Sequence, residues 1–248
     1  MLTAPMDSQA AIIWLESAEN THHPNHNQSQ MQRSTLLPLA TVFVLASAMP
    51  LVADQPGKAI FQDDFENGTD RWEMLDPMTW KLAERDGNKT IEITERSSKY
   101  KPPVRSPGHV ALIKDIAASS FEITFRVRST KDTGNHRDCC VFFNYIDDQH
   151  FYYVHLGAKP DPHSGQIMIV NEAPRKAMTT NERLTPWDDE WHDVKVSRDV
   201  DSGEIRVYFD DMQKPHMLVT DKTFNKGRIG IGSFDDLNEF DDVVVRTL

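Results

Sequence analysis

Cysteine is scarce in this sequence, which holds only Cys139 and Cys140 among its 248 residues. Two cysteines exclude a disulfide framework and a four-cysteine zinc site. Basic residues are also few, because 27 Lys and Arg stand against 38 Asp and Glu, for a net charge of -11. Nucleic acid and anionic bilayers repel a chain this acidic, so neither is an expected partner.

Long hydrophobic runs are missing as well. The longest, at 36–48 (LLPLATVFVLASA), contains Pro38 and is shorter than the ~18 residues that a transmembrane helix needs. It follows Arg33 and ends in the small residues Ala46, Ser47 and Ala48, which is the pattern of a secretory signal peptide. The sequence therefore predicts an exported protein, secreted or periplasmic, with no membrane insertion after cleavage.

The position of this segment sets the predicted domain organisation. A signal peptide normally begins a protein, so we predict that translation starts at Met31 and that 1–30, rich in Asn, Gln, His and Ser, is a disordered leader. The signal peptide is expected over 31–53. A single domain follows over 54–248.

Helical periodicity is nearly absent from this domain, and period-two alternation bounded by turn residues recurs throughout it. Many closely spaced strands in one domain are typical of sandwiches and jelly rolls. We predict an all-β fold, a two-sheet antiparallel β-sandwich with at most one short helix. The clearest predicted strands are 90–94, 120–128, 139–146, 151–156, 166–171, 192–197, 204–210, 228–233 and 241–246.

Three blocks carry a resemblance to a known superfamily: 61–68 followed by Trp72, 144–154, and 227–234 with 240–243. Over 58–248 the chain resembles the concanavalin A-like lectin/glucanase superfamily, a jelly-roll fold. It is similar to laminin-G-like modules and to secreted bacterial domains related to 3-keto-disaccharide hydrolases. The resemblance implies the fold and a glycan partner but no single activity, because the superfamily holds lectins, glycosidases, lyases and inert modules.

Strand parity gives a candidate binding surface. On 120–128 the apolar side chains alternate with polar ones, and the polar set includes Arg126 and Arg128. We predict that strands align these arginines into one patch with other polar side chains, namely Asn144, Tyr153, His155 and Asn171. The alternative is that these residues form the solvated face of a sheet. Trp187 is a candidate for stacking on a sugar or, equally, a packing anchor.

Arginines in an acidic protein suit a carboxylate or sulfate on a sugar. We therefore predict a carbohydrate-binding module that recognises an anionic polysaccharide. The alternative is an enzyme, either a polysaccharide lyase with His155 or Tyr153 as base and Tyr153 as acid, or a glycoside hydrolase. The sequence lacks the Glu-x-Asp-x-(x)-Glu pattern of the glucanases, the Lys-Ala-Gly element of the jelly-roll alginate lyases and a Gly-x-Ser-x-Gly elbow.

Carboxylates near both ends of the domain suggest a calcium site. Asp63 and Asp64 lie near its start and Asp241 near its end, and a jelly roll commonly brings its terminal strands together. We predict that these residues bind Ca²⁺, with solvated acidic edges as the alternative. Cys139 and Cys140 point to opposite faces of one predicted strand, which favours buried free thiols over a strained disulfide between neighbours.

Overall fold

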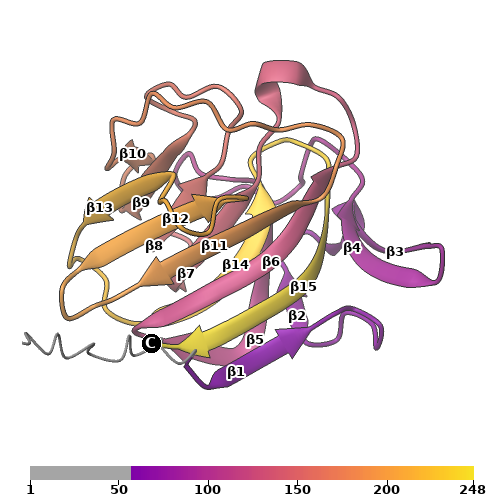
Figure 1. Cartoon of the computed structure of the whole chain (residues 1–248), viewed down its shortest axis with the longest axis horizontal. Helices are drawn as coiled ribbons and strands as arrows, with labels where there is room; N and C mark the ends of the chain where they lie inside the picture. The colour runs from indigo at the N-terminus through magenta and orange to yellow at the C-terminus, as the bar shows by residue number, and fades with distance from the viewer. Residues whose placement is uncertain (1–56) are drawn as a thin grey trace, which may run out of the picture. The chain divides into compact units, whose positions relative to one another are not determined.

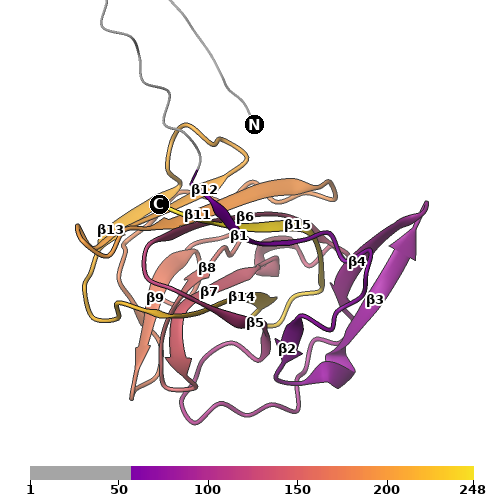
Figure 2. The same ribbon diagram turned by 90° about the horizontal axis from the view of Figure 1, so that it is seen from below.

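The computed structural model describes residues 57–248, so the predicted leader and signal peptide lie outside the described part. Two antiparallel sheets are stacked face to face, as Figures 1 and 2 show from two directions. The predicted all-β sandwich is therefore confirmed. Between 57 and 248, no helix has the length and apolar character that crossing a membrane requires.

Fifteen strands and two short 3-10 turns make up the structure, and every predicted strand is present with ends shifted by at most three residues. The elements are β1 (Ala59–Asp63), β2 (Trp72–Met74), η1 (Pro77–Thr79), β3 (Trp80–Arg85), β4 (Asn88–Ile93), β5 (His109–Ala118), β6 (Phe121–Ser129), η2 (Gly134–His136), β7 (Cys140–Asp147), β8 (His150–His155), β9 (Gln166–Asn171), β10 (Lys176–Ala177), β11 (His192–Arg198), β12 (Glu204–Phe209), β13 (Met217–Thr220), β14 (Gly227–Ser233) and β15 (Asn238–Thr247).

The eight-stranded sheet has the order β13-β12-β11-β6-β15-β4-β3, with β1 also paired to β15. The seven-stranded sheet has the order β10-β9-β8-β7-β14-β5-β2. β6 and β7 follow each other in the sequence but belong to different sheets, as do β14 and β15. These crossovers place neighbouring parts of the sequence on opposite layers of the sandwich.

The main core lies between the two sheets. On β6 the burial alternates without a break, and the predicted core residues Phe121, Ile123, Phe125 and Val127 are at most 2% exposed. They pack against inward residues of the other sheet such as Phe143. Burying one such side chain contributes about 1.5–3 kcal/mol, so this alternation fixes which face of β6 meets the core.

A second apolar cluster covers the outer face of the seven-stranded sheet. It is built on Phe142, Phe151 and Tyr153, and side chains from the connecting loops, among them Tyr100 and Val104, pack on it. This sheet is therefore buried on both faces near β7 and β8. Strand β5 lies in this covered sheet and is not among the predicted strands. Its first five residues are all buried, so they show no alternation that would reveal a strand.

Candidate functional site

The single patch predicted from strand parity does not form. Arg126 and Arg128 lie on β6, on the outer face of the eight-stranded sheet. Tyr153 and His155 lie on β8, on the outer face of the seven-stranded sheet, where Tyr153 belongs to the second apolar cluster. The prediction of one patch is wrong. Alternation along a strand tells which face of that strand a side chain occupies, but the crossovers decide which of the two sheets the strand belongs to.

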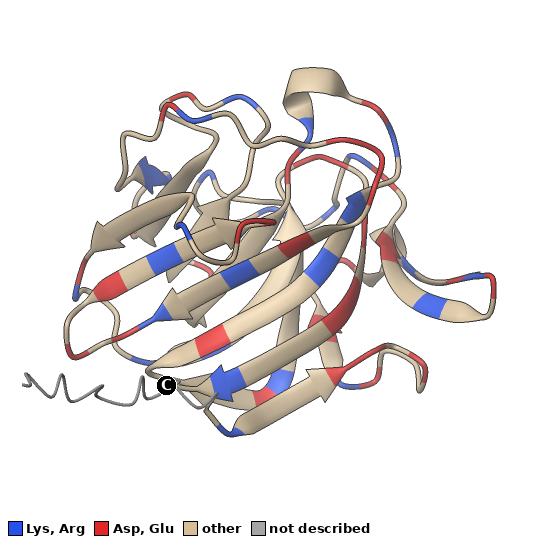
Figure 3. Cartoon of the chain, viewed as in Figure 1, with Lys and Arg blue, Asp and Glu red and all other residues tan. Residues whose placement is uncertain are grey.

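Both arginines of β6 are engaged by carboxylates from β15. Arg128 donates through Nε to Glu239 at 2.7 Å, and Glu239 is fully buried. Arg126 lies 3.6 Å from a carboxylate oxygen of Asp242, and both guanidinium groups lie over the Trp191 ring. Figure 3 shows charges of both signs along the strands of this face. This surface matches the alternative interpretation, a solvated sheet face whose charges compensate one another.

Asn144 is interior and structural. Its φ of 43° marks a β-bulge that shifts the pairing of β7 with β8 and β14. Its amide donates to the Ala118 carbonyl at 3.1 Å and accepts from buried Arg198 at 3.3 Å. Gly227 lies against this bulge, where a Cβ would come within 2.2 Å of the Asn144 carbonyl carbon. The bulge reverses the expected parity, so Tyr145 faces outward.

Asn171 and Trp187 also lie apart from the predicted patch. Asn171, at the end of β9, is exposed and borders a separate cleft of about 550 Å³ beside β10 and β13. The Trp187 indole donates to the Leu156 carbonyl at 2.7 Å and packs edge-on against His192 and Phe209. Trp187 therefore acts as a packing anchor in this structure.

The carboxylates predicted to bind calcium are not gathered into one ligand group. Asp63 accepts hydrogen bonds from the Phe65 amide at 3.1 Å and the Trp72 indole at 2.9 Å. Asp64 accepts from the Glu66 amide at 3.2 Å, and Asp241 accepts from Asn88 at 3.0 Å. These protein donors occupy oxygens that a calcium ion would need, since calcium takes six to eight.

A cleft of about 410 Å³ opens where β7 begins and β8 ends, on the seven-stranded sheet. His155 and Asp138 line it, at 5% and 3% exposure. The loops around it contribute cationic and aromatic side chains, namely Arg105, Lys159, Arg175 and Phe234. We call this the His155 cleft. It contains one of the two residues predicted to be catalytic, together with partners that the sequence analysis did not select.

Asp138 and His155 form a buried pair in this cleft. His155 donates from Nδ1 to the His163 carbonyl at 3.0 Å, and its Nε2 lies 3.8 Å from an oxygen of Asp138. The other Asp138 oxygen accepts from the Ser233 hydroxyl and the Phe234 amide, both at 2.9 Å. Burial raises the pKa of Asp138, but the neighbouring imidazole of His155, with these donors, holds that pKa below its usual value.

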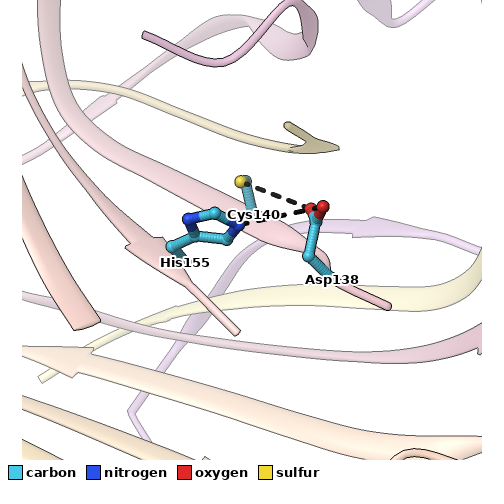
Figure 4. A group of neighbouring side chains, drawn as sticks. All are labelled: Asp138, Cys140 and His155. Carbon is cyan, nitrogen blue, oxygen red and sulfur yellow. Dashed lines mark hydrogen bonds and ion pairs between the residues drawn. The ribbon is translucent and has the colours of Figure 1, made fainter. Parts of the chain in front are cut away.

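Strand geometry adds Cys140 to this pair. Cys140 is the cross-strand partner of His155, and Asp138 precedes it by two residues, so all three side chains share a face. Their potential ligand atoms lie within 4.8 Å of one another, and this is the one such group of donors found between 57 and 248. Figure 4 shows the three side chains pointing toward one another. Carboxylate, thiolate and imidazole are ligands that a transition metal can use.

Tyr153 lies beneath the cleft. Its ring is beside His155, with centroids 6.2 Å apart, and it is fully buried. Its hydroxyl has no hydrogen-bond partner in the described part of the chain. Burial raises the pKa of Tyr153 well above its ordinary value, so the phenol keeps its proton. A buried hydroxyl without a partner costs free energy, and such costs concentrate at functional sites.

The cations of the cleft form no ion pair in the described part of the chain. None of Arg105, Lys159 and Arg175 lies within ion-pair distance of a carboxylate of residues 57–248, and the buried Nε of Arg175 has no hydrogen-bond partner there. The guanidinium groups of Arg105 and Arg175 lie over the Phe234 ring, at 5.4 and 4.3 Å from its centroid. The cleft therefore offers a ligand three cationic groups that form no ion pair among the described residues.

The other carboxylates that line the cleft have partners elsewhere. Asp235 lies 3.6 Å from Arg96, and Asp161 accepts from the His163 amide at 2.6 Å. Neither carboxylate forms an ion pair with any of the three cations. Sequence reasoning missed Arg105 because it lies in a loop, where no periodicity reports on orientation.

Comparison with known proteins adds the fold class and no closer relationship. No family model and no curated protein sequence matches the chain. A solved structure of the carbohydrate-binding module CBM66 from Bacillus subtilis matches 71% of this chain and 96% of its own, with a TM-score of 0.52 and 17% identity. The chain adopts the concanavalin A-like fold.

Domain 4 of AbnA, a GH43 extracellular arabinanase from Geobacillus stearothermophilus, is a second solved structure that matches this chain. It was solved in complex with arabinotriose. It covers 78% of this chain and 94% of its own, with a TM-score of 0.50 and 12% identity. At these identities the similarity shows the fold alone, so the function has to come from the site.

Proposed function

We propose that this protein binds an anionic saccharide in the His155 cleft. The observation that carries the proposal is the set of three cations, Arg105, Lys159 and Arg175, that line one cleft without a carboxylate partner among the described residues. Guanidinium groups bind carboxylates and sulfates bidentately. Two structures of this fold are a carbohydrate-binding module and an arabinanase domain bound to arabinotriose, which supports a saccharide ligand.

The proposed site lies on the seven-stranded sheet and not on the eight-stranded sheet, where Arg126 and Arg128 lie. The proposed ligand class, an anionic polysaccharide, is unchanged. The anionic polysaccharide predicted from Arg126 and Arg128 is now assigned to arginines of the seven-stranded side. Export, proposed from the signal-like segment 36–48, fits a protein that meets polysaccharide outside the cell. Calcium is not part of the proposal, because protein donors already occupy oxygens of Asp63, Asp64 and Asp241.

A glycan array with uronate, sulfated and neutral oligosaccharides tests the ligand class, and titration calorimetry tests the site. We expect Arg175→Ala to weaken binding of the best anionic ligand by about 10- to 100-fold, because it removes a charge-assisted hydrogen bond of about 1–3 kcal/mol. Arg126→Ala is the matched control, since it removes the same group from the opposite sheet. Equal effects of the two substitutions, or an array that shows only neutral ligands, would contradict the proposal.

A lyase is the second candidate, because cations and an imidazole line the cleft and the buried phenol of Tyr153 lies beside that imidazole. A lyase needs a neutraliser for the uronate carboxyl, a base and an acid. Arg175 suits the first role, His155 the second and Tyr153 the third. The geometry favours binding over catalysis, since both ring nitrogens of His155 face protein groups, the His163 carbonyl and Asp138.

Incubation with the preferred polysaccharide distinguishes these two functions. A lyase would release unsaturated uronates that absorb in the ultraviolet, and His155→Ala would lower turnover by about 100-fold or more while the substrate still binds. For a binding protein we expect no absorbing product from the unmodified chain. Steady product formation that depends on His155 would replace the binding proposal with the enzyme.

A further inference from the structure

We infer that Asp138, Cys140 and His155 form a binding site for a transition-metal ion of the zinc class at the floor of the His155 cleft. The inference goes beyond saccharide binding and does not depend on it. It rests on the distances between the three donors, on the groups that orient them and on their access to the cleft.

The spacing of the donors fits an ion better than a proton. His155 Nε2 and the nearer Asp138 oxygen are 3.8 Å apart, which is too long for a hydrogen bond. Cys140 Sγ lies 4.0 Å from the other Asp138 oxygen. Two ligands bound at about 2.0–2.3 Å to one tetrahedral ion lie about 3.3–3.6 Å apart. The three ligand atoms lie within 4.8 Å of one another, so shifts of up to about 1 Å bring them to bonding distance.

Neighbouring groups orient the donors as they do around bound metals. A metal-ligating histidine usually donates its other ring N–H to a carbonyl or carboxylate, and His155 donates Nδ1–H to the His163 carbonyl. This bond turns Nε2 toward Asp138, so the nitrogen and a carboxylate oxygen face the same space. Ser233 and the Phe234 amide hold Asp138 in place from behind. The site therefore presents ligand atoms already oriented toward one point.

The donor set selects the kind of metal. Thiolate and imidazole ligands favour zinc and its transition-metal neighbours over calcium and magnesium, which prefer oxygen. Three protein ligands leave a fourth position open. Asp138 and His155 both line the cleft, so the ion has an entry path and its fourth ligand can come from the cleft.

Titration of the full chain with Co²⁺, a spectroscopic substitute for zinc, tests the site with no saccharide present. We expect one thiolate-bound ion per chain, reported by a thiolate-to-cobalt charge-transfer band that excess Zn²⁺ removes. The band is specific because the chain has only 2 cysteines. Metal uptake without the band, as the histidines at 22, 23 and 26 would give, overturns the inference, and so does the absence of uptake.

Cys140→Ser should abolish the band, and His155→Gln should lower the affinity by at least about 100-fold. Cys139→Ser is the matched control, because Cys139 is equally buried but belongs to the core on the opposite side of the strand. We expect it to keep the band and an affinity within about twofold. Loss of the band in Cys139→Ser but not in Cys140→Ser would contradict the assignment. Circular dichroism of each variant checks the fold, and the unmodified chain decides the question if a variant does not fold.

Discussion

Two regions of this protein share one motif and use it differently. On the eight-stranded sheet Arg126 and Arg128 lie over Trp191, and in the His155 cleft Arg105 and Arg175 lie over Phe234. The first pair is neutralised by carboxylates of β15, whereas the second has no carboxylate partner in the described part of the chain. Two arginines on an aromatic ring are therefore no binding site by themselves. What distinguishes the regions is whether a distant strand supplies the counter-charge.

The largest effect that we expect is the loss of stability caused by removing an arginine of the first pair. Arg128→Leu should lower the free energy of unfolding by about 2–4 kcal/mol, because it leaves the fully buried Glu239 with only part of its compensation, from Arg85 and Thr90. Urea denaturation measures the change. The double variant Arg128→Leu with Glu239→Leu should recover much of the loss, since no buried charge remains. A double variant less stable than the single one would contradict this explanation.

The next effect concerns the ligand itself. Reducing the carboxyl groups of the preferred saccharide to alcohols should weaken binding by about 10- to 100-fold, because the arginines of the cleft lose charge-assisted bonds. Calorimetry with the native and reduced forms gives the ratio. High salt should weaken the native form more than the reduced form. Equal affinities would show that shape and not charge selects the ligand.

A pH effect on stability should come from His216. Burial, with the charge of Arg183, lowers the pKa of His216 to about 4, whereas an unfolded histidine titrates near 6.5. The unfolded chain therefore binds more protons between these values, so the stabilisation is present above about pH 6.5 and lost as pH falls toward 4.

His216→Gln should flatten this pH dependence of the free energy of unfolding, which we expect to be about 1–3 kcal/mol between pH 4 and 7. The glutamine can still hydrogen bond to Thr185, the partner of His216 at 3.1 Å. Denaturation curves at several pH values measure it. Parallel pH profiles for the variant and the unmodified chain would assign the effect to other groups.

The smallest expected effect is on the stability of the cleft. Arg175→Ala should change the free energy of unfolding by no more than about 0.5 kcal/mol, since Arg175 has no ion pair to lose and its buried Nε has no partner. Groups placed for a ligand commonly contribute nothing to stability. A loss as large as that of Arg128→Leu would mean that Arg175 is structural, and it would remove the contrast between the two regions.

Much of the fold could be predicted because burial leaves a period in the sequence. β6 alternates strictly and was located to within one residue, whereas β5 is buried on both faces at its start and shows no alternation. The shared face of Phe151, Tyr153 and His155 followed from the same rule. The outward orientation of Tyr145 did not follow from this rule, because the bulge at Asn144 inserts a residue that a pattern of period two does not reveal.

The candidate site divides in the same way. By itself the sequence determined the all-β class, the inward face of β6 and the common face of Tyr153 and His155, because each depends on neighbours along one strand. Only the tertiary structure decided that Arg126 and His155 lie on different sheets and that Cys140 meets His155 across a hairpin. It also decided that loop arginines meet at Phe234. Those relations depend on strand pairing and crossovers between distant residues, and no local period in a single sequence encodes them.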